Sequence, residues 1–407
     1  MKIEILSIGS EIILGNTINT NASYISKKLL ENGFASTFYS VCKDEINDIQ
    51  NCFKIALDRS DLIIITGGLG PTIDDITKKT ISDFLNLELV FNKEIYLDIE
   101  KRFSTISSIK EQSTVFKDAI ILKNTIGTAS GFFIKYKNKI FILLPGVVFE
   151  LKKMFEDALA LIKERFLLEK KVFQKFLNIF LVKEIDVDNF LKTLKIPKEL
   201  EIGIYPEQGI VKVTLTSNDM GIIEKFKTEI EKKYNKNIFY EESIQKAVHN
   251  AFINKNFKLC IAESCTGGAI SSKLTALSGA SKYFLGSFVT YSNDLKKNIL
   301  KVDENILKSC GAISKEIVIE MVKGVFDITD ADFAIAVSGI AGPFGETDIK
   351  RIGLVYIAVG RKSGIIDVYK FHFEKDRELV IESASNHALG ILYKKVYYNE
   401  SFNNARV

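Results

Sequence analysis

Apolar and helical patterns alternate over the first 168 residues of the chain. The segments IEILSIGSE (3–11) and DLIIITGG (61–68) are typical of strands, and the second is apolar enough to be buried on both faces. Residues 20–32 and the segment TKKTISDFL (77–85) have helical spacing. This alternation predicts a doubly wound α/β domain.

The next pattern is a period of two in GFFIKYKNKIFILLPG (131–146), which predicts a hairpin with a turn near Asn138. The segment VFELKKMFEDALALIKERF (148–166) then has helical spacing. We expect this helix to close a domain that spans residues 1–168.

Two further blocks follow. Residues 169–242 predict a small α+β module, with helices near DVDNFLKTL and IIEKFKTEIEKKY and strands EIGIYP and IVKVTLTS. Residues 243–407 predict a second α/β domain. Its expected helices are 243–255, 267–277, 293–300, 314–326 and 376–393, and its expected strands are 257–262, 284–291, 332–337, 352–360 and 366–373. The fold prediction is therefore α/β, with two three-layer α/β/α domains joined by a small α+β module.

Composition narrows the class of protein. A net charge of +4 over 407 residues, with both signs interspersed, gives no electrostatic footprint for nucleic acid. No apolar run approaches the ~20 residues of a membrane span, and Glu4 interrupts any signal-peptide core. The five cysteines are scattered without a C-x-x-C pair. We expect a cytoplasmic protein with no cysteine-based metal site.

The segment AESCTGG contains two candidate nucleophiles, Ser264 and Cys265, between a strand and a helix. The amino terminus of a helix can present unpaired N–H groups to an anion. In the alternative interpretation, Ser264 or Thr266 is only a helix N-cap and Cys265 is an apolar filler.

The segment GSFVTYSNDLKKNIL adds Tyr291, Asn293 and Lys296 just after the next strand. A serine needs a base to take its proton, and none of the three histidines falls at a strand end or glycine turn. Lys296 is the candidate base, provided that burial, with help from Arg377 or Lys350, lowers its pKa. We therefore prefer Ser264 over Cys265 as the nucleophile.

A third segment, AVSGIAGPFGETDIKRIG, places a glycine-rich loop at the end of another strand. Such a loop can turn backbone N–H groups toward an anion, or it can be only a flexible turn. Together the three segments resemble, in order, the carboxy-terminal domain of the CinA family. The resemblance implies a nicotinamide mononucleotide deamidase with a serine nucleophile and a lysine base. It assigns Ser264, Lys296 and Tyr291 as catalytic residues, and Glu263, Thr266, Gly267, Gly268, Asn293, Gly339, Gly342, Lys350 and Arg377 as substrate-binding residues.

The amino-terminal block carries TGGLGPTIDDITKKT, in which glycines could cradle a phosphate and Asp74 and Asp75 could hold a divalent cation. Alternatively, Asp74 only caps the following helix. This block resembles the CinA amino-terminal domain, related to the molybdopterin-binding MoaB/MogA fold. The resemblance implies an ADP-ribose pyrophosphatase that uses Mg, Mn or Co. The candidate residues are Glu11, Asn19, Asn21, Gly67, Gly68, Gly70, Thr72, Asp74, Asp75, Gly146 and Glu150.

The middle block matches the KH-like module of that family in position, but it contains no G-x-x-G loop, so we expect no RNA binding. The family resemblance also implies a homodimer. The rival hypothesis is a competence- or damage-associated binding protein with one or both sites inactive. A role in molybdenum-cofactor handling would rest on fold analogy alone.

Overall fold

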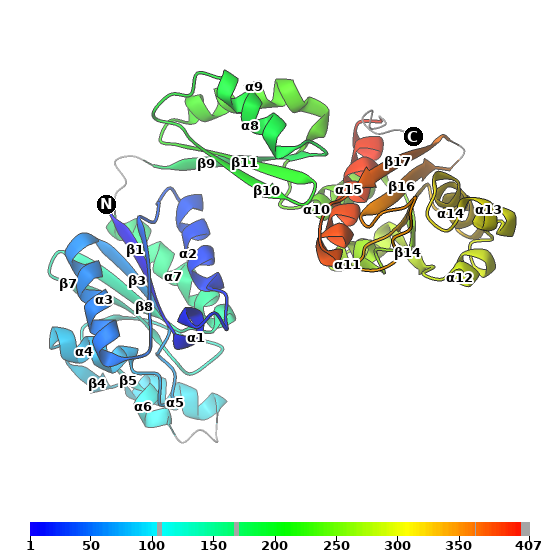
Figure 1. Cartoon of the computed structure of the whole chain (residues 1–407). Coiled ribbons are helices and arrows are strands. Elements are labelled where there is room, and N and C mark those ends of the chain that lie inside the picture. The colour runs from blue at the N-terminus through cyan, green and yellow to red at the C-terminus, as the bar shows by residue number, and fades with distance from the viewer. Residues whose placement is uncertain (104–107, 167–170, 363, 400–407) are drawn as a thin grey trace. The chain divides into compact units, whose positions relative to one another are not determined.

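The computed structural model describes residues 1–103, 108–166, 171–362 and 364–399. The chain divides into two compact units, Met1–Gln174 and Lys175–Val407, which are described separately (Figure 1). Both units are mixed α/β structures, so the predicted fold class is confirmed at this level.

The first unit is built on a sheet with strand order β2-β1-β3-β8-β7-β6. Strands β2, β1, β3 and β8 are parallel; β7 pairs antiparallel with β8, and β6 pairs antiparallel with β7. The strands are β1 (Ile3–Ile8), β2 (Phe38–Cys42), β3 (Leu62–Thr66), β6 (Ile120–Leu122), β7 (Gly131–Tyr136) and β8 (Lys139–Leu144). The predicted hairpin turn near Asn138 is confirmed.

Helices cover both faces of this sheet because neighbouring strand residues point to opposite sides. Ile64 packs with α2 (Thr20–Glu31) and α7 (Val148–Arg165), whereas Ile63 and Ile65 pack with α3 (Ile46–Arg59) and α4 (Thr77–Leu85). The helix predicted over residues 77–85 is observed with those bounds. The remaining elements are α1 (Ser10–Ile13), β4 (Leu89–Phe91), α5 (Lys93–Arg102), α6 (Ile109–Gln112) and β5 (Thr114–Phe116).

The second unit begins with the middle module, a sheet of order β10-β11-β9-β12 with two helices. Its elements are β9 (Phe173–Phe180), α8 (Glu184–Thr193), β10 (Glu201–Glu207), β11 (Ile210–Ser217), α9 (Met220–Tyr234), the short 3-10 helix Asn235–Asn237 and β12 (Ile238–Phe239). Phe180, Ile210 and Phe239 belong to the same hydrophobic cluster as the core of the carboxy-terminal part. The module and the following domain therefore form one compact unit.

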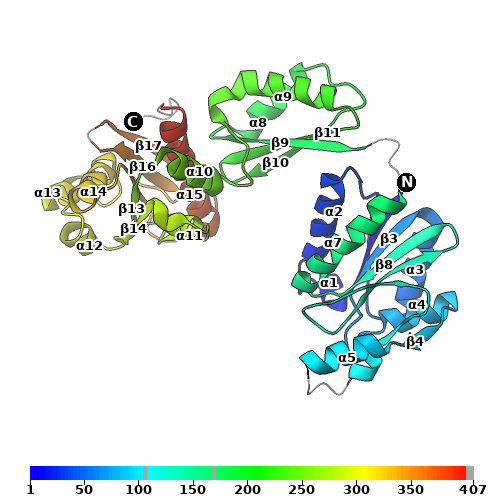
Figure 2. The same ribbon diagram turned by 180° about the vertical axis from the view of Figure 1, so that it is seen from behind.

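The carboxy-terminal part has a sheet of order β14-β13-β15-β16-β17, in which β14, β13 and β15 are parallel. Helices α10, α11 and α15 cover one face and α13 and α14 the other; α10 and α15 lie side by side (Figure 2). The strands are β13 (Leu259–Glu263), β14 (Phe284–Val289), β15 (Phe333–Gly339), β16 (Leu354–Arg361) and β17 (Ile366–His372). The helices are α10 (Ile244–Lys255), α11 (Ala269–Thr275), α12 (Asn293–Asn298), α13 (Glu304–Cys310), α14 (Lys315–Ile328) and α15 (Arg377–Tyr397), with a 3-10 turn at Ala280–Lys282.

Candidate functional site

Three motif segments meet at one edge of the carboxy-terminal sheet. Because β13 pairs in parallel with β14 on one side and β15 on the other, all three strands end at the same edge. Ser264 follows the last residue of β13, Tyr291 follows β14 by two residues, and Gly342 follows β15 by three. This edge is where open α/β sheets bind ligands.

A buried contact between Ser264 and Lys296 lies at the centre of this edge. The Lys296 Nζ atom is 3.0 Å from Ser264 Oγ, 2.8 Å from the Thr290 carbonyl oxygen and 3.3 Å from the Tyr291 carbonyl oxygen. A neutral amine has two N–H groups, which the two carbonyls can accept, and one lone pair, which then faces the serine hydroxyl. The arrangement suits proton transfer from Ser264 to Lys296.

The protonation state of Lys296 is set by its surroundings. The side chain is only 1% exposed, and burial lowers its pKa from 10.5 to about 8, although the nearby Cys265 acts in the opposite direction. The expectation that Arg377 or Lys350 would help is wrong, because neither is among the causes of this shift; Lys350 Nζ donates to the Cys310 carbonyl at 2.6 Å. Burial is the cause that lowers the pKa.

Cys265 does not have the properties of a nucleophile. Its side chain is 5% exposed and packs in the hydrophobic core, and burial raises the pKa of its thiol to about 12. The thiol is therefore protonated near neutral pH, whereas nucleophilic attack requires the thiolate. This matches the alternative in which Cys265 is an apolar filler.

Glu263 has a different role from the one expected. Its carboxylate is fully buried and accepts hydrogen bonds from the backbone N–H groups of Gly268 (3.0 Å), Ile270 (3.2 Å) and Ser271 (3.0 Å). Our assignment of Glu263 to substrate binding is wrong, and so is the idea that the start of α11 is open to an anion. The carboxylate at the end of β13 occupies that position, where its negative charge interacts favourably with the helix dipole. Neither Ser264 nor Thr266 caps α11.

Arg377 connects the second and third motifs. Its Nη1 group donates to the Gly342 carbonyl at 2.7 Å, and its Nη2 group donates to the Tyr291 hydroxyl at 3.1 Å. The tyrosine side chain is 58% exposed, and Arg377 is exposed as well. A guanidinium carries five N–H groups, so donors remain for a ligand.

The other predicted residues of this site are glycines that shape the backbone and one exposed asparagine. Gly267 and Gly268 adopt φ values of +60° and +99°, which favour glycine and shape the turn after Ser264. Asn293 is exposed at the start of α12. Gly339 is needed for packing, because a Cβ there would lie 2.6 Å from the Leu354 carbonyl oxygen.

Two threonines beside the Ser–Lys pair have buried hydroxyls. Thr266 is 3% exposed and Thr290 is fully buried, and neither Oγ1 atom has a hydrogen-bond partner within the described residues. Across the same described part of the chain, the backbone N–H groups of Cys265 and Thr266 donate to no backbone carbonyl. We had not predicted Thr290, although it lies inside the VTYSN motif.

The first unit contains a cleft of about 710 Å³ at the carboxyl edge of its sheet. The loops after β1, β2, β3 and β8 all contribute to its walls. Five carboxylates line it, and no lysine or arginine appears among the described residues of its wall. These acidic residues are Glu11, Asp44, Asp74, Asp75 and Glu150. Asp44 was missed, because β2 is short and half-exposed and gives little signal in the sequence.

The glycine loop after β3 has the backbone conformation expected of a tight cradle. Gly67 and Gly68 have φ values of +101° and +66°, and a Cβ at either position would come within 2.1 Å of a neighbouring oxygen. Thr72 donates from its backbone N–H to Asp75 Oδ2 at 3.0 Å. A hydrogen bond with Thr72 lowers the pKa of Asp74, which is exposed. The alternative that Asp74 is the N-cap of α4 is wrong, since Ile76 holds that position.

Other predicted residues of this unit lie in and around the cleft. Gly70 and Gly146 are part of its wall, and so is Glu150, whose Oε2 atom accepts from Asn124 Nδ2 at 2.7 Å. Asn19 and Asn21 are not among the wall residues. Asn19 caps α2 by accepting from Ala22 N, and Asn21 donates to the Gly146 carbonyl at 2.7 Å. We therefore correct their role from ligand contact to support of the surrounding loops.

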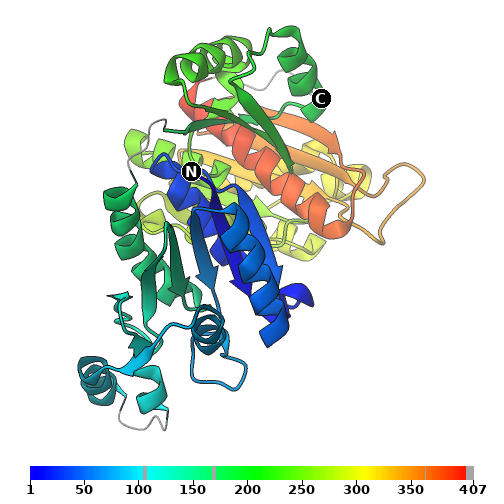
Figure 3. The same cartoon turned by 90° about the vertical axis from the view of Figure 1, so that its left-hand side faces the viewer.

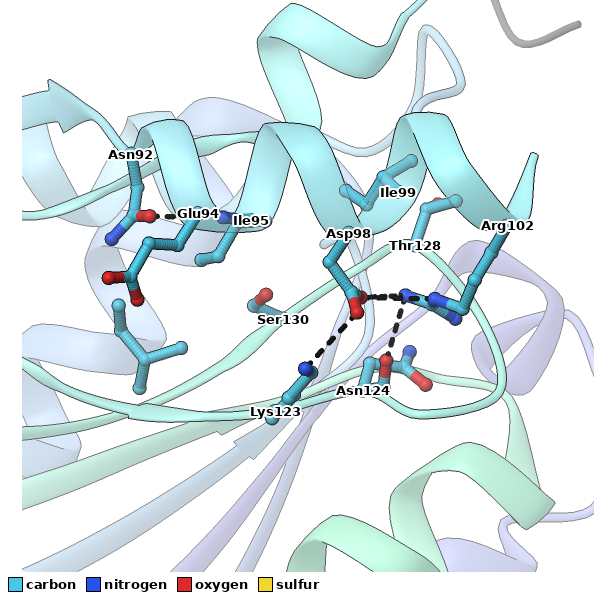
Figure 4. Close-up of a pocket in the computed structure, with 11 residues that line it drawn as sticks. Asn92, Glu94, Ile95, Asp98, Ile99, Arg102, Lys123, Asn124, Thr128 and Ser130 are labelled. Carbon is cyan, nitrogen blue, oxygen red and sulfur yellow. Dashed lines mark hydrogen bonds and ion pairs between the residues drawn. The ribbon is translucent and has the colours of Figure 1, made fainter. Parts of the chain in front are cut away.

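A smaller cavity of about 220 Å³ lies beside the cleft and shares Thr128 with it (Figure 4). Three of its charged groups, Asp98, Arg102 and Lys123, are bonded to one another. Asp98 accepts from Arg102 at 2.7 Å and from Lys123 at 3.1 Å, as the dashed lines in Figure 4 show. Arg102 also donates to the carbonyls of Asn124 (3.1 Å) and Gly127 (3.0 Å). This network fixes the loop that forms one wall of the larger cleft.

Comparison with known proteins identifies both parts of the chain. Residues 241–396 match the model of the CinA C-terminal domain, and residues 4–164 match a family described as a probable molybdopterin binding domain. A CinA-like protein of Thermosipho melanesiensis is 36% identical over 95% of this chain and 98% of that protein. A CinA-like protein of Pseudothermotoga lettingae is also 36% identical, over 96% of this chain and 97% of the relative. A crystal structure of a CinA superfamily protein from Klebsiella pneumoniae is 34% identical and covers 38% of this chain and 96% of its own, with a TM-score of 0.37.

These findings define a multidomain α/β protein that combines a MoaB-like domain with a CinA carboxy-terminal domain. The chain belongs to the CinA family. Among the described residues, no helix has both the length and the apolar composition that a bilayer crossing requires.

Proposed function

We propose that the carboxy-terminal site is an amidase that converts nicotinamide mononucleotide to nicotinate mononucleotide and ammonia. The observation that carries the proposal is the 3.0 Å contact between Ser264 Oγ and the buried Lys296 Nζ. Ser–Lys pairs are a recognised variant of the hydrolytic triad. The choice of substrate follows from the motifs that this chain has in common with the CinA family.

The reaction has two halves in which Lys296 first accepts and then returns a proton. Ser264 Oγ attacks the carboxamide carbon while its proton passes to Lys296 Nζ. The C–N bond then breaks, and ammonia leaves with the proton from Lys296. Water next attacks the acyl-enzyme, Lys296 again takes a proton and returns it to Ser264, and the carboxylate product is released.

Backbone groups after the nucleophile can stabilise the oxyanion. The N–H groups of Cys265 and Thr266 follow Ser264 directly, and within the described part of the chain neither donates to a backbone carbonyl. Donors of this kind, fixed before the reaction, stabilise the negative charge that develops on the carbonyl oxygen. The free N–H groups of Arg377 are suited to the phosphate of the nucleotide.

The test is ammonia release from nicotinamide mononucleotide by the purified chain. Wild type should release stoichiometric ammonia, and Ser264→Ala should lose activity on the order of 10³-fold. A matched control is Ser281→Ala, a serine of the same domain outside the site. Full activity in Ser264→Ala would refute the assignment of the nucleophile.

For the amino-terminal cleft we propose metal-dependent hydrolysis of the pyrophosphate of ADP-ribose. An acidic wall whose described residues include no lysine or arginine repels an unaccompanied pyrophosphate and attracts a divalent cation. Across the described residues, no three Asp, Glu, His or Cys side chains are grouped to hold a metal. Asp74 and Asp75 therefore fit a Mg²⁺-type ion that keeps several waters, rather than a cage made only of protein ligands.

The bound metal would neutralise the pyrophosphate and activate a water molecule. The glycine loop at Gly67–Gly70 would place backbone N–H groups near the phosphates. The test is release of AMP from ADP-ribose with Mg²⁺, Mn²⁺ or Co²⁺ added singly. Activity that persists in excess chelator would refute the requirement for a metal.

A further inference from the structure

Helix α15 uses one face to bind the middle module. Residues at helical spacing on this face contact it, and the module lies over the helix in Figure 3. Ser383 Oγ donates to Gln208 Oε1 at 3.1 Å, and Asn386 Nδ2 donates to the Gln208 carbonyl at 2.9 Å. A Cβ at Gly390 would lie 3.0 Å from the ring of Phe180. The packing is close over two turns of the helix.

The contact is centred on the turn between β10 and β11. Gly209 has a φ of +79°, and a Cβ there would lie 2.6 Å from the imidazole of His387. That imidazole packs at a steep angle against the stacked rings of Phe371 and Phe373, with centroids 4.8 and 4.9 Å away, and its Nδ1 atom is 2.8 Å from the Ser383 carbonyl oxygen. The turn backbone therefore fits against a fixed surface.

The same turn reaches the segment that carries Arg377. Lys375 Nζ donates to Gln208 Oε1, so this one amide oxygen accepts from both Lys375 and Ser383. Lys375 precedes Arg377 by two residues, and Arg377 is the first residue of α15. Arg377 in turn contacts Gly342 and Tyr291 at the Ser–Lys site. The hydrogen bond to Lys375 and the two residues of backbone that follow it thus join the middle module to the expected phosphate ligand.

We propose that Gln208 of the middle module is a positioning residue for Arg377, and so sets the affinity of the carboxy-terminal site for the phosphate of its substrate. This inference rests on the proposed deamidase function. Gln208 ties Lys375, two residues before α15, to Ser383 in the body of the helix. Without it, Lys375 and Ser383 lose their common acceptor, and the guanidinium two residues later is less well fixed. Gln208 acts only through Arg377 and does not touch the reacting atoms.

The test compares two substrates that differ only in the phosphate. Gln208→Ala should raise the KM for nicotinamide mononucleotide about fivefold and leave kcat within twofold, since it weakens binding uniformly. Its kcat/KM for nicotinamide riboside, which lacks the phosphate, should equal that of wild type. Gln208→Glu keeps an oxygen acceptor for both donors and should restore the wild-type KM. Glu207→Ala, at the exposed last residue of β10 next to Gln208, is the matched control and should be neutral.

The outcomes separate this inference from the function on which it rests. If wild type releases no ammonia from either substrate, the deamidase proposal fails, and the inference fails with it. If wild type is active and Gln208→Ala impairs both substrates equally, Gln208 has only a structural role and the inference is overturned. An unchanged KM in Gln208→Ala overturns the inference and leaves the deamidase proposal intact.

Discussion

Replacement of Lys296 by arginine tests how Ser264 is activated. Burial lowers the pKa of Lys296 from 10.5 to about 8, which corresponds to about 3 kcal/mol in favour of the neutral amine. At pH 7 the neutral fraction then rises from about 1 molecule in 3,000 to about 1 in 10. Arginine keeps the positive charge but cannot release its proton near neutrality. We therefore expect Lys296→Arg to lose ammonia release on the order of 10³-fold.

The same mechanism fixes the direction in which the activity of the wild-type enzyme changes with pH. Because the active form is the neutral amine, kcat/KM should rise with pH, pass its midpoint near the pKa of about 8, and level off above it. Lys297→Arg is the matched control. This neighbouring lysine forms an ion pair with Glu304 at 3.5 Å, and the variant should keep wild-type activity and pH profile.

Two results would refute this reasoning. If Lys296→Arg retained substantial activity, Lys296 would only position the substrate, and another base would be needed. The range from pH 6 to pH 9 contains the expected pKa of about 8. If kcat/KM were flat over this range, the titration of a buried lysine would not control the reaction. Circular dichroism of Lys296→Arg would verify that the larger guanidinium has not unfolded the domain.

Three further changes give distinct readouts. Cys265→Ser should keep most ammonia release, because the buried thiol is protonated and serves only to pack; loss of activity comparable to Ser264→Ala would reverse the assignment. Glu263→Gln should lower the free energy of unfolding in urea by about 2–3 kcal/mol, since it removes a charged acceptor from three backbone donors at the start of α11; an unchanged midpoint would contradict this role. Asp74→Asn should abolish metal-dependent ADP-ribose cleavage and leave ammonia release unchanged, and loss of both activities in a folded protein would contradict two independent sites.

Much of the fold could be predicted from local patterns. The helix at 77–85 and the hairpin around Asn138 follow from apolar periodicity, and both are observed. The meeting of Ser264 and Lys296 could also be predicted, because both lie just beyond strands that end at one edge of a parallel sheet. In such cases the position in the sequence and the rules of sheet topology determine which side chains meet.

Side-chain contacts that depend on tertiary packing could not be predicted in this way. Glu263 belongs to the AESCTGG motif, and only its burial and its three backbone donors show that it caps α11. The Lys350 side chain reaches the end of α13, a helix that the sequence pattern did not reveal. The binding of the Gln208 turn to α15 joins residues about 175 positions apart, which no local pattern encodes.

The central claim is that Ser264 and Lys296 form a hydrolytic pair. The most direct measurement is the mass of the protein after rapid mixing of nicotinamide mononucleotide with wild type and with Ser264→Ala, followed by an acid quench. We predict a transient mass increase that corresponds to the nicotinate mononucleotide ester, located on the peptide that contains Ser264, together with ammonia release. The Ser264→Ala variant should show neither. An acyl group on another residue, or ammonia release without any dependence on Ser264, would contradict the account.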